Sequence, residues 1–420
     1  MASKPEFGLY HVFENFQSLI PTVAEMSTAA LVVTAPNAQA GIEINEPYRI
    51  NATDSAFYTA LGEGGTARDA IRTLNSQQKD AATDLVIVVA AEGATEAETV
   101  ANVRGDIALK TGMQALRRAP VKLGVTPRLL SLPGYTSSAA HTAVVDDLPG
   151  LLDYLTAVAF IGAPNAGRQE TIDWREGLPS HKRLIPAETH AYVTDPDGSP
   201  VLVDAAPALV GKQVAVDTGK GGFPFHAIAN RQLFGLRDPG REIDFDLRDG
   251  DTEGQILLAA GVGFIEAGQI GVDGAIADGG LTIIATDTTS EDEEEEHYNV
   301  VRGRDWIELT QLKTLRDFLG KYNLTGHTMV AFAQTVEDIL RAVRNEGHIA
   351  GFEVSLPAAR NAATALADGE LTTVFRAQPF PIFKRGRLIH KPYRAALTTT
   401  LEAARRRLDD GVALAGGFSG

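Results

Sequence analysis

A short window in the first half of the chain contains the residue types of a serine hydrolase. Ser137 and Ser138 precede His141, and Asp146 and Asp147 follow it. Such an enzyme needs its serine, histidine and carboxylate in mutual hydrogen-bond contact, which closeness in sequence does not establish. A serine placed just before a helix more commonly caps that helix. We therefore predict a helix cap at Ser137 or Ser138 and no catalytic residue.

Other patterns associated with chemistry are incomplete. Residues 218–223 lack the leading glycine and the Ser/Thr of a phosphate loop, and the glycines of residues 62–65 and 261–266 lack the dinucleotide fingerprint. The chain has no cysteine, and none of its nine histidines has a partner at a zinc-ligand spacing. We expect no cofactor and no metal site.

The charge of the chain is distributed unevenly. The net charge is −16, yet residues 376–420 contain nine basic and three acidic residues, a charge of +6, so the other residues carry −22. Opposite potentials steer association, which predicts contact between the tail of one copy and the body of another. The acidic run at residues 291–296 is interpreted as a solvated loop, a contact for a basic partner surface or, as a third alternative, a cation site.

Composition excludes several classes of protein. With 420 residues, 44% of them hydrophobic, the chain is long enough for two or three domains. An acidic protein is not a general nucleic-acid binder, because neutralising phosphates needs a basic surface. The longest apolar run, residues 257–265, is shorter than the roughly 20 residues that span a bilayer, and the first residues lack a signal-peptide core. We expect no membrane insertion.

The elements that position these residues alternate between strands and helices. Buried strands are predicted at residues 29–35, 84–91, 127–132 and 157–161, with helices at 66–74, 113–118, 139–154 and 206–214. This alternation is typical of βαβ units and a mostly parallel sheet, so the predicted fold class is α/β. Turn residues within 192–203 predict a hairpin.

The second half is predicted to be more helical, with a domain boundary at the acidic run. Trp306, Leu309, Leu312, Leu315, Leu319 and Tyr322 recur at spacings of three and four, which predicts one amphipathic helix. A second helix is expected at residues 335–345, followed by strands at 348–354 and 370–376 with a short helix between them. Residues 378–390 combine β-favouring residues with prolines that suit an edge strand, so we interpret the tail as an arm that pairs with a neighbour.

Motifs along nearly the whole chain resemble, in their order and spacing, those of contractile phage tail sheath proteins. They are residues 34–38, 84–89, 127–134, 347–354 with Asn361 and the turn at 368–371, and 379–381. The resemblance implies a structural protein and no enzyme, whose copies stack as six-fold rings around an inner tail tube and contract. It also implies a subtilisin-like α/β middle domain without a working protease site.

The resemblance further implies a domain order. The expected parts are an N-terminal extended arm at 1–26, the start of the outer and middle region at 27–94, the middle subtilisin-like domain at 95–285, an inner, tube-facing C-terminal α+β domain at 286–384, and a basic C-terminal arm at 385–420. Residues 281–287 depart from the pattern, because the family has an aromatic, arginine-containing strand before its C-terminal domain.

In this family the arms reach into neighbouring subunits and complete a shared sheet. The interface residues implied here are Leu9, Tyr10, Val12 and Phe13 in the N-terminal arm, and Phe383, Lys384, Arg385, Arg387, Leu388 and Ile389 in the C-terminal arm. Expected partners are other copies of the chain, the tail tube protein, and the baseplate and tail terminator proteins, in a virion tail assembled in the bacterial cytoplasm. Alternatives are the sheath of a phage-derived bacteriocin or injection particle, a serine hydrolase with a subtilisin-like fold, and an unrelated oligomeric scaffold.

Overall fold

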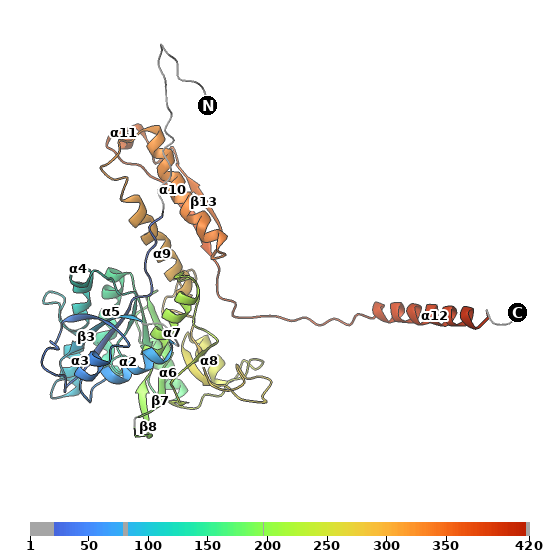
Figure 1. Ribbon diagram of the computed structural model, residues 1–420, viewed down its shortest axis with the longest axis horizontal. Helices are drawn as coiled ribbons and strands as arrows, with labels where there is room; N and C mark the ends of the chain where they lie inside the picture. Colours follow the sequence, from blue (N-terminus) through green and yellow to red (C-terminus); the bar gives the residue numbers. More distant parts are fainter. Residues whose placement is uncertain (1–20, 79–82, 196, 417–420) are drawn as a thin grey trace, which may run out of the picture. The chain divides into compact units, whose positions relative to one another are not determined.

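A mixed sheet is the centre of the computed structural model, which describes residues 21–78, 83–195 and 197–416. Nine strands of these residues form it, in the order β2-β3-β1-β4-β5-β6-β11-β12-β9. Figure 1 shows the sheet with the helices that flank it. The strands are β1 (Ala29–Thr34), β2 (Pro47–Asn51), β3 (Asp84–Ala90), β4 (Leu129–Ser131), β5 (Val158–Gly162), β6 (Leu184–Glu188), β9 (Arg231–Leu233), β11 (Gly263–Ala267) and β12 (Leu281–Ile284). The run from β3 to β11 is parallel, and β2, β12 and β9 are antiparallel to their neighbours.

Both faces of this sheet are buried. In β1, Leu31 and Val33 contribute to the core on one face, while Ala30 and Val32 contribute to the core on the other. Successive strand side chains point to opposite faces, so a strand buried on both sides must be apolar throughout, as β1 is. The α/β fold class is confirmed.

Helices cover the two faces. On one side α2 (Ala67–Ser76) packs against α7 (Ala206–Gly219), and on the other α3 (Glu96–Arg104) packs against α5 (Thr142–Leu155). The shorter helices are α1 (Ser55–Ala60), α4 (Ala119–Leu123), α6 (Arg168–Glu176), α8 (Glu253–Ala259) and the 3-10 turns η1 (Gly112–Arg118) and η2 (Ala139–His141). The helix predicted at residues 113–118 is therefore a 3-10 helix that continues as α4.

The predicted hairpin is confirmed. β7 (His190–Thr194) pairs antiparallel with β8 (Pro200–Asp204), and β10 (Asp238–Pro239) adds to the other edge of β7. The amide of Asp195 donates to the carbonyl of Ser199 at 2.9 Å and closes the turn.

Two long helices follow the acidic run, α9 (Tyr298–Leu315) and α10 (Gly326–Asn345). The predicted amphipathic helix is confirmed in part, because Trp306 is buried and Leu309 and Leu315 pack against the same core. The helix ends at Leu315, however, and Leu312, Leu319 and Tyr322 are exposed. The buried face of α9 is partly polar and includes Arg302. Its polar groups find partners on other elements, so apolar spacing alone did not identify the buried side.

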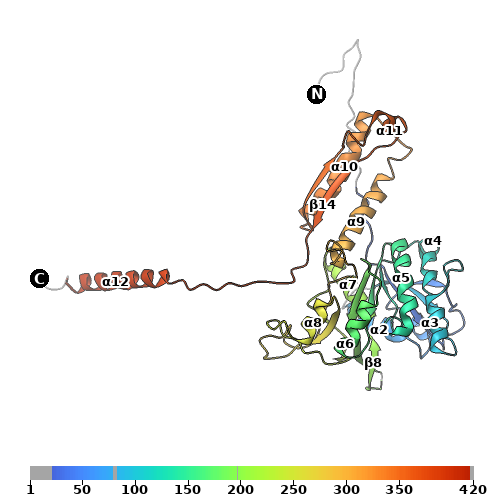
Figure 2. The ribbon, with the colours of Figure 1, turned by 180° about the vertical axis from the view of Figure 1, so that it is seen from behind.

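A two-stranded antiparallel sheet packs against α10 (Figure 2). It consists of β13 (Ile349–Ser355) and β14 (Val374–Pro379), joined through α11 (Ala363–Ala367). Asn361 fixes this connection, because its amide donates to the carbonyl of Thr372 at 2.9 Å and its oxygen accepts from the amide of Thr372 at 2.8 Å.

Residues 383–420 form a separate unit from residues 1–382. The strand predicted at residues 378–390 is limited to its first residues, since β14 ends at Pro379. Residues 380–394 have no strand in the single chain, and an unpredicted helix, α12 (Ala395–Gly416), follows. A strand that needs a partner's edge for its hydrogen bonds has no reason to form alone.

Candidate functional site

The serine, histidine and aspartate window does not assemble a catalytic site. The Oγ of Ser138 and the Nδ1 of His141 have no hydrogen-bond partner, so they are not paired with each other. The Nε2 of His141 lies 3.6 Å from a carboxylate oxygen of Glu96, and Asp147 forms an ion pair with Arg104 at 2.6 Å. Burial lowers the pKa of His141. Ser138 occupies the position before η2, but its side chain makes no capping hydrogen bond, so the predicted cap is not formed.

Hydrogen bonds link several loops at the carboxyl edge of the parallel strands, where α/β enzymes usually bind substrates. Asp204 accepts from the hydroxyl of Thr189 at 2.5 Å, the amide of Gly134 at 2.8 Å and the amide of Ala206 at 3.0 Å. Thr34 and Tyr135 form a hydroxyl–hydroxyl hydrogen bond of 3.0 Å at the same edge. These groups serve to hold loops together.

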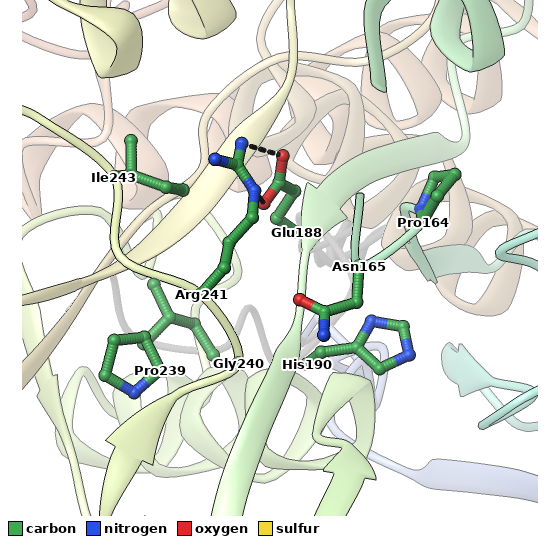
Figure 3. A pocket seen from close by; sticks show the side chains of 9 residues that line it. Pro164, Asn165, Glu188, His190, Pro239, Gly240, Arg241 and Ile243 are labelled. Carbon is green, nitrogen blue, oxygen red and sulfur yellow. Dashed lines mark hydrogen bonds and ion pairs between the residues drawn. The ribbon is translucent and has the colours of Figure 1, made fainter. Parts of the chain in front are cut away.

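A small pocket beside β6 is closed by an ion pair (Figure 3). Arg241 donates to both oxygens of Glu188, at 2.7 and 2.8 Å, and to Glu253 at 2.7 Å, while Thr171 donates to Glu188 at 2.8 Å. The remaining space is about 10 Å³, which is room for about one water molecule. This arrangement anchors the segment around β10 to the sheet and leaves no space for a substrate.

A buried ion pair joins α7, which covers one face of the sheet, to α9. Arg302 and Asp217 are 1% and 0% exposed, and the two guanidinium nitrogens donate to the two carboxylate oxygens at 2.5 and 3.1 Å. Arg302 also donates to the carbonyl of Met26 at 2.9 Å, and Gln213 donates to Asp217 at 2.7 Å. Burial raises the pKa of Asp217, and Arg302 opposes that shift. The segment at Met26, α7 and α9 are thus joined through Asp217 and Arg302. We call this contact, together with the ion pair and the aromatic cluster described next, the junction.

A second buried pair reinforces the junction. Arg183, next to β6, donates to Asp305 of α9 through two nitrogens, one of them at 2.9 Å, and to Asp153 of α5 at 3.0 Å. The side chains of Arg183 and Asp305 are each 8% exposed. Since truncating one partner of such a pair leaves a buried charge, α9 is held firmly against the α/β domain.

Aromatic side chains complete the junction. Phe225 stacks on His348 at a centroid distance of 4.9 Å, and Phe223 and Trp306 pack beside them. Burial lowers the pKa of His348, so its neutral form is favoured in this apolar setting.

The chain enters the fold along α9 (Figure 1). The amides of Thr22 and Ala24 donate to the hydroxyls of Thr314 and Thr310 at 3.0 and 3.2 Å. Met26 is buried in the core shared by α9, α10 and β13, which together with β14 we call the helical domain. The N-terminal segment is therefore fixed to the C-terminal domain before it reaches β1. Leu9, Tyr10, Val12 and Phe13 lie outside the described residues.

The C-terminal interface residues lie just beyond β14, in the separate unit. Phe383, Leu388 and Ile389 are 87%, 98% and 67% exposed, and residues 384–387 are exposed as well. Within the described residues, β13 and β14 pair only with each other, so each has an edge of unpaired backbone groups.

The acidic run is partly engaged within the chain. Glu294 pairs with Arg304 at 3.2 Å and Glu295 with Lys182 at 3.0 Å, while residues 291–293 are exposed. Asp287, Glu296 and His297 have ligand atoms within 4.8 Å of one another, which the sequence analysis did not recognise. The Nδ1 of His297 lies 3.4 Å from Asp287, an ion pair when the histidine is protonated.

In the described residues, no helix is both long and apolar enough to cross a bilayer.

Glu266 on β11 supplies a test of buried charge. It is 5% exposed, and burial, with Asp244 and Glu242 nearby, raises its pKa to about 7. The folded state therefore holds a proton that the unfolded state releases above its pKa of 4.5, and stability falls as pH rises through 7. We expect Glu266→Gln to raise the free energy of unfolding at pH 8 by about 1–3 kcal/mol, with little change at pH 4. Denaturant unfolding at both pH values, with exposed Glu293→Gln as control, measures this; equal effects at the two pH values would contradict it.

Known proteins resemble this chain in sequence and in fold. No family model matches the sequence. A protein of Pseudomonas aeruginosa (strain UCBPP-PA14) described as "Putative prophage major tail sheath protein" is 25% identical over 354 residues, covering 81% of this chain and 83% of that protein. The chain in the contracted PVC sheath complex of an extracellular contractile injection system is 13% identical, with a TM-score of 0.68 over 93% of this chain and 98% of that one.

A chain in the six-fold symmetrised baseplate of the anti-feeding prophage is similar too, at 15% identity and a TM-score of 0.62, over 93% of this chain and 99% of that one. The resemblance to contractile tail sheath proteins inferred from the motifs is confirmed by these matches. Because they extend over most of each chain, the shared fold includes both the α/β domain and the helical domain.

Proposed function

We propose that this chain is the sheath subunit of a contractile tail or injection system, which polymerises as stacked hexameric rings around a tail tube and contracts to drive the tube through a cell envelope. The observation that carries the proposal is the match over nearly the full length of sheath-type chains, in fold and in part in sequence. It implies a structural role and no enzyme, and the Ser138 and His141 side chains, which are not paired with each other, agree with that.

The two-stranded sheet is the proposed assembly point. Its unpaired edges suit β-augmentation, in which a strand from another chain adds backbone hydrogen bonds. The arm residues Phe383, Lys384, Arg385, Arg387, Leu388 and Ile389 directly follow β14, and Leu9, Tyr10, Val12 and Phe13 precede the segment bonded to α9. Both arms therefore leave the fold from the helical domain. A head-to-tail contact of this kind generates open helical polymers.

The junction suggests which parts move. Two buried ion pairs and the aromatic cluster fix α9 to the α/β domain, whereas residues 383–394 have no regular structure. We therefore place the hinges of contraction in the arms and treat residues 21–382 as one rigid body. Contraction would then need no nucleotide, because new contacts between rigid subunits supply the work.

Other partners follow from the same proposal. The exposed apolar residues Leu312, Leu319, Tyr322 and Val330 on and between α9 and α10 are candidates for the tube-facing surface. A baseplate contact is supported by the similarity to a chain in a baseplate structure. Binding of the tube and terminator proteins, assembly in a bacterial cytoplasm, and residence in a phage tail or a phage-derived particle are parts of the proposal.

Electron microscopy of the purified full chain at high concentration tests the function. We expect hollow cylinders with helical striations, wide enough to enclose a tube, alone or when tube and baseplate proteins are added. Monodisperse globular particles under all of these conditions would contradict the sheath proposal.

A further inference from the structure

An open pocket lies between α5 and α6 at the carboxyl ends of β4 and β5, where Thr136, Ser138 and Pro164 also line it. Its volume is about 410 Å³, within the range of roughly 300–1,000 Å³ typical of ligand pockets. Glu170, Asp173, Trp174 and Gly177 line it at spacings of three and four, so one face of α6 and the residue after it form one wall. Asp146 of α5 lies on the opposite wall.

The walls combine an aromatic ring with negative charge. The indole nitrogen of Trp174 donates to the carbonyl of Thr136 at 3.1 Å, which fixes the ring in the pocket wall. Asp146, Glu170 and Asp173 are exposed, and none of them is in an ion pair among the described residues. The ion pair with Asp147 raises the pKa of Arg104, and Asp146 adds to that shift. Gln169 donates to Asp173 at 2.7 Å, so one carboxylate is already held in place. Apolar contacts are available from Val145 and Leu178.

This chemistry suits an arginine side chain. The guanidinium group stacks on aromatic rings and donates to carboxylates, while its methylene stem packs on apolar surface. An anionic ligand would be repelled by the three carboxylates, and a wholly apolar one would gain no attraction from them.

The chain itself contains an arginine cluster of the right charge. Arg405, Arg406 and Arg407 are consecutive on α12, where they are exposed, and their unit is basic while the rest of the chain is acidic. The basic residues at 384–387 belong to the proposed strand-forming arm, which leaves the α12 cluster without an assigned contact. Consecutive helical residues are about 100° apart, so the three arginines cover a little more than half of the circumference of α12.

We propose that the α5–α6 pocket binds an arginine of the α12 cluster of a second copy. This inference rests on the proposed function to the extent that assembly brings a second copy close. It adds an electrostatic contact, distinct from strand pairing, between the tail of one subunit and the α/β domain of another.

The test uses the full chain in which Arg405, Arg406 and Arg407 are changed to Gln, so that its own tail cannot compete. A synthetic peptide of residues 395–416 is titrated into this dissolved protein while tryptophan fluorescence is recorded; Trp174 is one of only two tryptophans in the chain. We expect a saturable change that weakens with added salt and disappears when Trp174→Phe is introduced. The same peptide with its three arginines replaced by Gln should not bind.

Matched variants locate the contact. When Asp146→Asn, Glu170→Gln and Asp173→Asn are added to this protein, its affinity for the peptide should fall by at least about tenfold, equivalent to 1.4 kcal/mol. The control Glu291→Gln, Asp292→Asn and Glu293→Gln changes the net charge equally at the exposed acidic loop, and should alter affinity by less than about twofold. Circular dichroism checks that both variants are folded.

Absence of saturable binding, equal binding of the arginine-free peptide, or equal losses in the two triple variants would overturn the proposal. Because the titration follows dissolved protein, these results are independent of whether cylinders form. Failure of the pocket contact and failure of the sheath function can therefore be told apart.

Discussion

Replacing Asp217 with Asn is expected to lower the free energy of unfolding by about 3–5 kcal/mol. The substitution preserves shape but leaves the Arg302 guanidinium, which is 1% exposed, without a counter-charge in the protein interior. Arg302 also donates to the carbonyl of Met26, so the N-terminal segment should loosen together with α9. Denaturant unfolding measures the loss, and limited proteolysis reports whether cleavage begins near the junction.

Two further variants separate the effect of breaking the buried ion pair from the effect of removing a carboxylate at the surface. Glu294→Gln removes the partner of Arg304, an exposed pair whose loss should cost less than about 1 kcal/mol. The double variant Asp217→Leu/Arg302→Met replaces both charges with apolar groups and should recover much of the stability lost in Asp217→Asn. A loss in Asp217→Asn no greater than in Glu294→Gln would refute the role assigned to the junction.

The α/β domain was the more predictable part of the fold. Its strands are apolar on both faces, so β1, β3 and β5 were visible as short uninterrupted apolar runs. Periodicity does not give the order of strands, and β12 pairs with β11 and β9, two strands that were not predicted. The α/β class could be predicted, but the sheet order could not.

The junction could not be predicted from the sequence. Asp217 and Arg302 are separated by 85 residues, and each alone is a charged residue in a helix, which normally indicates a solvated face. Their pairing depends on tertiary structure. The same burial of polar groups caused the error in α9, because Thr310 and Thr314 are buried to receive backbone amides from the N-terminal segment while Leu312 is exposed.

The tail illustrates a different limit. Its composition predicted a strand at residues 378–390, yet in the described residues no strand follows Pro379, and a helix that was not predicted, α12, begins at Ala395. Local sequence can encode an edge strand whose partner belongs to another copy, and that strand is absent until the partner is present. The arm residues thus remain predictions about an assembly and not about the subunit alone.

Ending the chain after Ile382 is expected to abolish polymerisation while leaving the subunit folded. Phe383, Leu388 and Ile389 are exposed in the single chain, so their removal should change the unfolding midpoint little. Assembly would lose every backbone hydrogen bond of the proposed C-terminal strand, together with the arginine cluster of α12. Pelleting by ultracentrifugation and electron microscopy measure polymer, and thermal unfolding measures the subunit.

A point variant separates strand pairing from the loss of α12. Leu388→Asp keeps the whole tail, but it places a charge where an added strand would bury a side chain, and it should raise the concentration needed for polymerisation by at least about tenfold, or 1.4 kcal/mol. Val121→Asp is the matched control, because Val121 is 91% exposed and lies on α4, outside the arms. Normal polymers from the truncated chain, or equal effects of the two point variants, would mean that the C-terminal arm does not link subunits. In that event the sheath assembly would have to depend on contacts between residues 1–382 alone.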